Sequence, residues 1–154
     1  MRQPVLILAA LAWLVASPDP GAAEASLLGQ WEIVDAAPAP WVAEDQRAAA
    51  AARGKRLLKT LIVFKAKEVT SKVKGLGCRR AEYQASEYPL DALFRGALPE
   101  PNQERVALNM GFKRGGDVPS VDLRCTTGQF TYHFRDPKTL LYAFDNVIYT
   151  LQRH

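Results

Sequence analysis

Hydrophobic and polar residues alternate along several short segments, most regularly in the C-terminal quarter of the chain. The segment 129–136 (QFTYHFRD) places its three aromatic residues on one face and leaves Thr131, His133 and Arg135 facing outward on the other. A period of two is typical of a half-buried strand. Short turns join this segment to the two alternating segments that follow, which indicates an antiparallel meander.

The same pattern along the whole chain predicts a mainly β fold with short helices. Strands are expected at residues 27–34, 57–67, 68–74, 78–86, 118–125, 129–136, 139–144 and 147–154, and helices at 41–54 (capped by Gly54), 89–96 and 101–111. A sheet of about eight strands in one small domain must close or fold over to bury its apolar face. We therefore expect an eight-stranded antiparallel meander barrel with two or three short helices, in which the last strand pairs with the first. A two-sheet sandwich is the alternative.

The N-terminus has the pattern of a secretory signal peptide. A positive charge precedes an apolar run at residues 5–16, which is short for a membrane-spanning helix. Small residues follow, and cleavage is expected after Ala25 or, alternatively, after Ala23. The sequence predicts a signal peptide at 1–25 and one domain at 26–154, in a periplasmic or secreted protein without a membrane span after cleavage. An uncleaved anchor is the alternative.

The chain has two cysteines, Cys78 and Cys125. In an exported protein an even pair predicts a structural disulfide, and closing a loop of about 47 residues contributes roughly 4 kcal/mol in the chain-entropy model. A free or redox-active pair is the alternative, although the spacing is far from C-x-x-C. Two distant cysteines and two histidines do not indicate a metal site, and no cofactor is expected.

Positive charge is concentrated in the middle of the sequence. Residues 53–80 contain ten lysines and arginines against one acid, Glu68, while the whole chain has a net charge of +4. Such a run favours an anionic partner. The expected patch for this partner consists of Lys65, Lys67, Lys72, Lys74, Arg79 and Arg80. The alternative is a solvated lysine face that keeps the strands soluble, and nucleic acid is not expected as a partner.

The first expected strand contains Gly29-Gln30-Trp31. A G-x-W at this place resembles the signature of lipocalins and their calycin relatives. The resemblance implies that Gly29, Trp31 and Arg153 close the barrel: the tryptophan plugs one end, and the arginine of the last strand lies across its ring. The T-D-Y element of many lipocalins is missing and an alanine-rich helix follows the first strand. The chain therefore looks more like the small lipocalin-like barrels that bacteria export, among them inhibitors of proteases and lysozymes.

Motifs for catalysis are sparse. Ser120, Asp122 and His133 fall on neighbouring strands, but no G-x-S-x-G motif places the serine on an activated turn, so we expect a binding protein and not an enzyme. The predicted function is binding of a small apolar or anionic ligand in the barrel or at its mouth. The expected lining residues are Phe64, Tyr83, Phe130, Tyr132, Phe134 and Tyr149. The alternative for these aromatics is an interior filled by its own side chains.

A second class of function is also open. The helical excursion at 89–116, with Phe94 and Met110, would form a loop rim that binds another protein, as the inhibitor barrels do. Such a protein would act on a periplasmic or secreted protease or lysozyme, with Arg79, Arg80 and the lysines of the basic run steering an acidic partner. A monomer is expected in either case.

Overall fold

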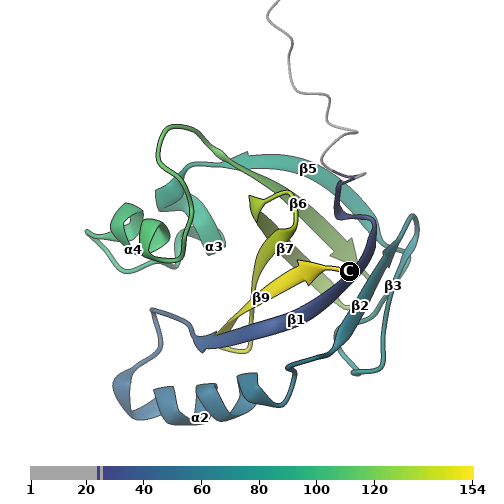
Figure 1. Cartoon of the computed structure of the whole chain (residues 1–154), viewed down its shortest axis with the longest axis horizontal. Coiled ribbons are helices and arrows are strands. Elements are labelled where there is room, and N and C mark those ends of the chain that lie inside the picture. The colour runs from purple at the N-terminus through teal and green to yellow at the C-terminus, as the bar shows by residue number, and fades with distance from the viewer. Residues whose placement is uncertain (1–23, 25) are drawn as a thin grey trace, which may run out of the picture.

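The computed structural model describes residue 24 and residues 26–154, so the expected signal peptide lies almost entirely outside the described residues. Nine antiparallel strands form one sheet that curls into a half-barrel, with the helices beside it (Figure 1). The strands are β1 (Gly29–Pro38), β2 (Leu61–Lys65), β3 (Glu68–Ser71), β4 (Cys78–Arg79), β5 (Glu82–Tyr88), β6 (Val118–Cys125), β7 (Gly128–Asp136), β8 (Thr139–Phe144) and β9 (Val147–Arg153). The helical segments are α2 (Glu44–Lys55), the 3-10 turn η1 (Leu90–Ala92), α3 (Leu93–Gly96) and α4 (Gln103–Asn109).

The strand order is β4-β3-β2-β1-β9-β8-β7-β6-β5. The expected pairing of the first strand with the last is confirmed, because Trp31 lies opposite Arg153 and Ala36 opposite Tyr149. One continuous sheet rules out the two-sheet sandwich. The hydrogen-bonded ladder is open between β4 and β5, so the sheet is a nine-stranded half-barrel where an eight-stranded closed barrel was expected.

The additional strand arises within the segment expected as one strand at 78–86. Arg80 has a left-handed backbone (φ 57°), which turns the chain between β4 and β5. Beyond the turn, the Ala81 N–H donates to the Lys67 carbonyl at 2.9 Å, and the Tyr83 hydroxyl donates to the Lys65 carbonyl at 2.7 Å. These bonds hold the start of the edge strand β5 and the residue before it against the end of β2 and the β2–β3 turn, at one corner of the sheet.

A disulfide reinforces the same corner. Cys78 and Cys125 are bonded, with their Cα atoms 5.7 Å apart, which confirms the predicted pairing. The bond ties the short edge strand β4 to the end of β6. Because the ladder is open here, the disulfide supplies a covalent link between the edge strand β4 and β6, the strand next to the other edge.

Two boundaries next to α2 differ from those expected. The helix continues past Gly54, so this residue does not cap it. The missing side chain instead allows close packing, because a Cβ at Gly54 would lie 2.9 Å from the Cβ of Ala36 and 3.0 Å from Val147 Cγ1. After the helix the chain turns through Lys59, which has a φ of 63°, and β2 therefore begins at Leu61, later than expected.

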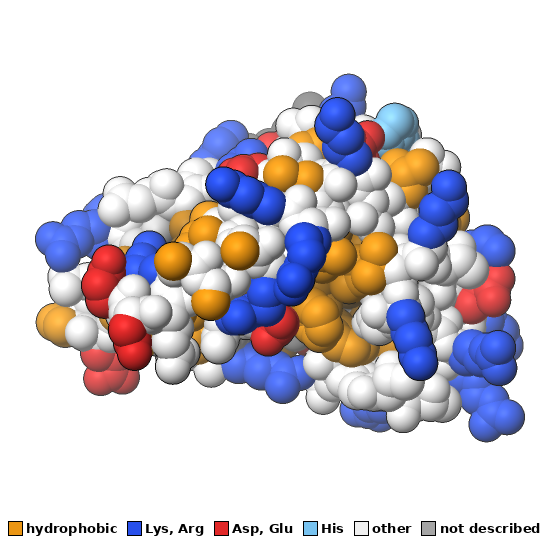
Figure 2. All heavy atoms as spheres, turned by 90° about the horizontal axis from the view of Figure 1, so that it is seen from below, with side chains coloured by type: hydrophobic (Ala, Val, Ile, Leu, Met, Phe, Trp, Pro, Cys, Tyr) orange, Lys and Arg blue, Asp and Glu red, His pale blue; other side chains and the backbone are white. Residues whose placement is uncertain are grey.

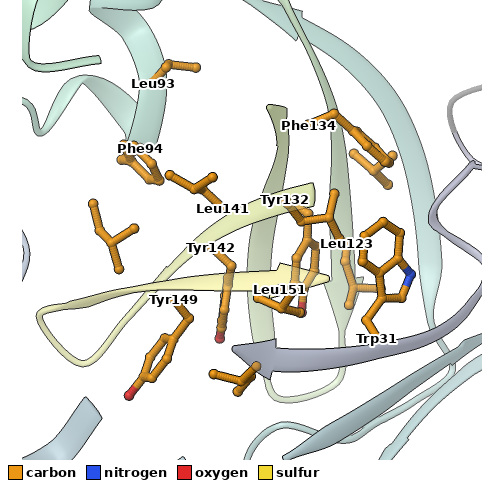
Figure 3. Packing of buried hydrophobic residues seen from close by; sticks show 14 of the residues in the cluster. Trp31, Leu93, Phe94, Leu123, Tyr132, Phe134, Leu141, Tyr142, Tyr149 and Leu151 are labelled. Atoms are coloured by element: carbon orange, nitrogen blue, oxygen red, sulfur yellow. The ribbon is translucent and has the colours of Figure 1, made fainter. Parts of the chain in front are cut away.

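Aromatic side chains fill the concave side of the sheet (Figure 3). At their centre, Tyr142 stacks on Tyr132 with ring centroids 4.8 Å apart, and it lies 6.1 Å from both Phe130 and Phe144 and 6.4 Å from Tyr149. This packing favours a filled interior over a hollow one. Among the described residues, no helix is long and apolar enough to cross a membrane.

Candidate functional site

A hollow of about 280 Å³ opens where β7 begins and β8 ends. Three phenylalanines dominate its apolar part, and polar side chains stand among them. The complete lining is Phe94, Arg95, Gln129, Phe130, Thr131, His133, Ala143, Phe144 and Asp145. The hollow therefore lies between the start of β7, the end of β8 and a segment from the middle of the sequence.

That middle segment is the excursion between β5 and β6, which contains η1, α3 and α4. It lies over the outer face of β6 and β7, and its own Leu93 and Leu98 are fully buried. The Phe94 N–H donates to His133 Nε2 at 3.1 Å, and Arg95 Nη2 donates to the Gln129 carbonyl at 2.9 Å. The excursion is thereby fastened to β7 beside the hollow.

His133 corrects one expectation from the sequence. It is on the outer face of β7, as the alternation predicts, but it is only 1% exposed and therefore does not face solvent. The excursion covers it, and the rings of Phe94 and Tyr88 meet its imidazole edge-on, with centroids 4.8 and 5.5 Å away. The alternation could not reveal this cover, because the covering residues lie far away in the sequence.

The hydrogen bonds of His133 assign its protons. The Ser120 hydroxyl donates to the Val118 carbonyl at 3.1 Å, so the oxygen accepts from His133 Nδ1 at 2.8 Å, while Nε2 accepts the N–H of Phe94. Burial lowers the pKa of His133 to about 4, although the charge of Asp122 acts in the opposite direction. Because Nδ1 carries a proton in this arrangement, it cannot take one from Ser120, and the pair acts as a structural link.

Asp122 belongs to a separate polar network on the outer face. Its carboxylate accepts hydrogen bonds from Thr131 Oγ1 at 2.6 Å, Ser86 Oγ at 2.7 Å and Tyr88 Oη at 2.9 Å. Burial raises the pKa of Asp122, but these three hydrogen bonds outweigh it and lower the pKa below its ordinary value. The carboxylate is thus satisfied by hydroxyl groups and does not contact the imidazole of His133.

The backbone at the edge of the hollow is strained. Phe94 (φ 53°, ψ 39°) and Arg95 (φ 61°, ψ 35°) are consecutive left-handed residues, although neither is glycine. Each such residue costs about 1–2 kcal/mol. This conformation turns the Phe94 ring and N–H toward His133 and places Arg95 at the margin of the hollow.

The two charged residues of the hollow differ in their partners. Asp145 forms an ion pair with Arg53 of α2, with Nε and Oδ2 3.1 Å apart. Arg95 is exposed and is hydrogen-bonded to a neutral carbonyl, and no carboxylate of the described residues forms an ion pair with it. The hollow therefore presents one cation whose charge is available to a ligand.

The structure does not bring the six expected lining residues into one cavity. Phe130 alone among them lines the hollow. Phe64 and Tyr132 contact each other inside, with centroids 5.0 Å apart, and Tyr149 is buried beside Tyr142. Phe134 packs against Trp31 at the opposite end, 6.3 Å between centroids. Tyr83 is bonded to a carbonyl, and burial raises the pKa of its hydroxyl to about 12.

At that opposite end, Trp31 is fully buried and its Nε1 donates to the Leu27 carbonyl at 2.8 Å. The guanidinium carbon of Arg153 lies 4.8 Å from the Trp31 ring centroid, which is the contact that the resemblance implied. Arg153 also donates to the carbonyls of Leu28 and Ser26. Gly29 has a φ of 122°, and a Cβ there would be 3.2 Å from Arg153 Nη1, so glycine suits both the backbone and the close arginine.

The six basic residues of the expected anionic-partner patch are all exposed. Lys65 is on β2 and Arg79 is on β4, and the other four residues are in the connections that precede or follow β3 and in the turn after β4. Lys65 is paired with Glu68 at 2.7 Å, and Glu68 lies opposite Arg79 in the sheet register. The patch is thus a separate surface from the hollow, which takes its cation from Arg95.

Sequence reasoning missed several residues of the hollow, among them Arg95, Gln129 and Phe144. Phe94 had been expected at a protein-binding rim, but its side chain is buried against His133. Within residue 24 and residues 26–154, no three His, Cys, Asp or Glu side chains are grouped as a metal site. Comparisons with family models, curated proteins and solved structures found no match for this chain.

Proposed function

We propose that this protein is a non-catalytic binding protein that holds a small ligand, with an apolar body and an anionic group, at the mouth of its half-barrel. The hollow beside Phe130, with Arg95 at its margin, carries the proposal. The volume of about 280 Å³ suits a molecule of one or two rings.

The chemistry of the lining supports this ligand class. Phe94, Phe130 and Phe144 offer faces and edges of aromatic rings to a planar apolar body. Arg95 can form charge-assisted hydrogen bonds with a carboxylate or a similar anion. Asp145 would repel such an anion, but Arg53 neutralises it.

The packing favours this site over the two alternatives from the sequence. The aromatic interior is occupied by its own side chains, so a ligand has more room at the mouth than between Tyr132 and Tyr142. Phe94 is buried and Met110 is partly buried, so neither offers a protruding apolar anchor to a protease or lysozyme. A small-molecule site therefore explains the geometry better than an inhibitory rim.

The proposal also includes export and kinship. The Cys78–Cys125 disulfide supports folding in an oxidising compartment, which agrees with a cleaved signal peptide at residues 1–25. The contact of Arg153 with Trp31 and the pairing of β1 with β9 support kinship with the small lipocalin-like barrels. We take the protein to act as a monomer.

A titration with naphthoate tests the site, because this ligand joins a planar apolar body to a carboxylate. Heteronuclear NMR should show saturable shifts at the Gln129 and Thr131 amides, and the neutral analogue naphthylmethanol should bind more weakly. Ala143→Trp should abolish binding, because the indole would occupy the hollow. Gln84→Trp is the matched control on β5, in a different and smaller depression, and should leave binding unchanged.

The proposal fails if naphthoate causes no saturable shifts in the folded wild-type protein. It also fails if the shifts centre on the interior aromatics, or if the two tryptophan variants lose binding equally. One-dimensional spectra of both variants verify that they are folded.

A further inference from the structure

Three large apolar side chains are exposed close together on the outside of β1 and β2. Val34 is 41% exposed, Leu58 38% and Leu61 40%. The Lys59 N–H donates to the Ile33 carbonyl at 2.8 Å. Val34 follows Ile33 and Leu58 precedes Lys59, so the two side chains belong to adjacent segments, and Leu61 starts β2 beside them. We call Val34, Leu58 and Leu61 the apolar patch. They are the large hydrophobic side chains that the described residues leave exposed, and their clustering makes this face a candidate interaction surface.

Cations surround the apolar patch. Exposed positive residues from the end of α2, the turn into β2 and the chain after β3 are Lys55, Arg56, Lys59, Lys72 and Lys74. The register places Ser71 opposite Ile62, so Lys72 comes next to Leu61 across the β2–β3 pair. Figure 2 shows hydrophobic side chains exposed on this side of the molecule with Lys and Arg side chains around them.

Few acids oppose this charge. The Glu32 carboxylate, opposite Leu61, is bonded to His154 Nε2 at 2.7 Å. Glu68 is held by Lys65 at 2.7 Å, and Asp35 is an exposed acid beside Val34. The cations therefore outnumber the acids, and two of these three carboxylates already have a partner.

We propose that this face docks the protein on an anionic phospholipid bilayer, lying on the surface without crossing it. The apolar patch would enter the boundary between headgroups and acyl chains, while the surrounding lysines and arginines contact lipid phosphates. A soluble acidic polymer would match the charge but would leave Val34, Leu58 and Leu61 in water. The combination of an apolar centre and a cationic border is what selects the bilayer.

Vesicle co-sedimentation with the folded chain tests the proposal. Vesicles of phosphatidylcholine mixed with phosphatidylglycerol should retain the protein, and added salt should weaken binding, whereas phosphatidylcholine alone should retain little. Each cation near such a surface strengthens binding by about fivefold, so the double variant Lys72→Glu with Lys74→Glu should weaken it by at least about 25-fold. Leu58→Ser with Leu61→Ser should weaken it by about tenfold, because two buried side chains are lost.

The matched control reverses two exposed cations on the far excursion, Arg105→Glu with Lys113→Glu, and should change binding by no more than about twofold. Lys72→Arg with Lys74→Arg should retain binding and shows that charge, not side-chain identity, is required. Equal losses in the patch and control variants would overturn the proposal, and so would equal binding to both kinds of vesicle. Undiminished binding of the Leu58/Leu61 variant, or binding to soluble polyphosphate but not to vesicles, would show a polyanion site instead.

Discussion

Both ends of the half-barrel contain backbone with a positive φ, but the residue types in that conformation differ. At the end closed by Trp31, the positive φ of 122° falls on Gly29, which has no Cβ to clash. At the end with the hollow, positive φ values of 53° and 61° fall on Phe94 and Arg95, where each costs about 1–2 kcal/mol. At Gly29 the positive φ therefore costs little, whereas Phe94 and Arg95 keep strain that glycine could have removed.

Each end also uses an arginine. Arg153 lies over the Trp31 ring and donates to the Leu28 carbonyl, so its guanidinium is part of the packed closure. Arg95 is exposed and donates to a single carbonyl, that of Gln129. The closed end satisfies its cation internally, whereas the open end holds its cation at an unfilled space. Retained strain beside an available charge supports the proposed ligand site at the open end, because stability alone would not maintain that strain.

The largest effect that we predict separates the ends by packing. Trp31→Ala should lower the free energy of unfolding by about 4 kcal/mol, because it empties a fully buried site. Phe130→Ala, at the partly open margin of the hollow, should cost about half as much or less. Urea denaturation of both variants measures the difference. Equal losses would mean that the hollow end is as tightly packed as the closed end.

The second prediction concerns pH at the open end. His133 has a pKa of about 4 in the folded protein against an ordinary value of 6.5, so the unfolded chain binds its proton first as the pH falls. The contribution of His133 to stability is therefore complete above pH ~6.5. As the pH falls from ~6.5 to ~4, the free energy of unfolding should decrease by about 3 kcal/mol. Urea denaturation across this range should show the loss.

His133→Gln is the control, because its side-chain oxygen can still accept the Phe94 N–H but does not titrate. The variant should be less stable near neutral pH and should have a flatter profile between pH ~6.5 and ~4. Asp122 has a lowered pKa, so its own contribution is lost at lower pH and leaves this window largely clear. An unchanged slope in the variant would assign the pH dependence to other groups.

The sequence predicted the closed end better than the open one. The period of two placed Phe130, Tyr132 and Phe134 inward, and the G-x-W resemblance led to Trp31 and Arg153. Both signals are local, or depend only on which strands are first and last. Such features can be read directly from a pattern of residues.

The open end depends on contacts that no local pattern contains. His133 looks like a solvated strand residue until the excursion, anchored through Phe94, covers it. The left-handed turns at Arg80 and Lys59 are equally hidden, since neither residue type favours that conformation. These turns split one expected strand and delayed another. At the hollow itself, Phe94 and Arg95 are left-handed against the same local preference. Tertiary packing fixes this conformation, which is why the hollow could not be assembled from the sequence.

A smaller effect tests the cation of the closed end. Arg153→Met should lower the free energy of unfolding by about 1–2 kcal/mol, because it removes the guanidinium over Trp31 and its hydrogen bonds to carbonyls while retaining an apolar stem. Naphthoate binding should be unchanged, since the site is at the other end. If the variant is fully folded and still loses naphthoate binding, the two ends are coupled.

The smallest effect tests whether strain at the open end serves binding. Arg95→Gly removes the Cβ that makes a φ of 61° costly, and Arg95→Ala removes the same guanidinium but keeps the Cβ. Glycine should therefore give the more stable variant by up to about 1 kcal/mol in urea denaturation, after its greater unfolded-state entropy is subtracted. Both variants should bind naphthoate about tenfold more weakly, because a charge-assisted hydrogen bond is lost. A glycine variant that is more stable and still binds as tightly as the wild type would show that Arg95 has no role in the ligand site. A glycine variant that is more stable and binds as weakly as Arg95→Ala would show that the strained position carries the guanidinium that the ligand needs.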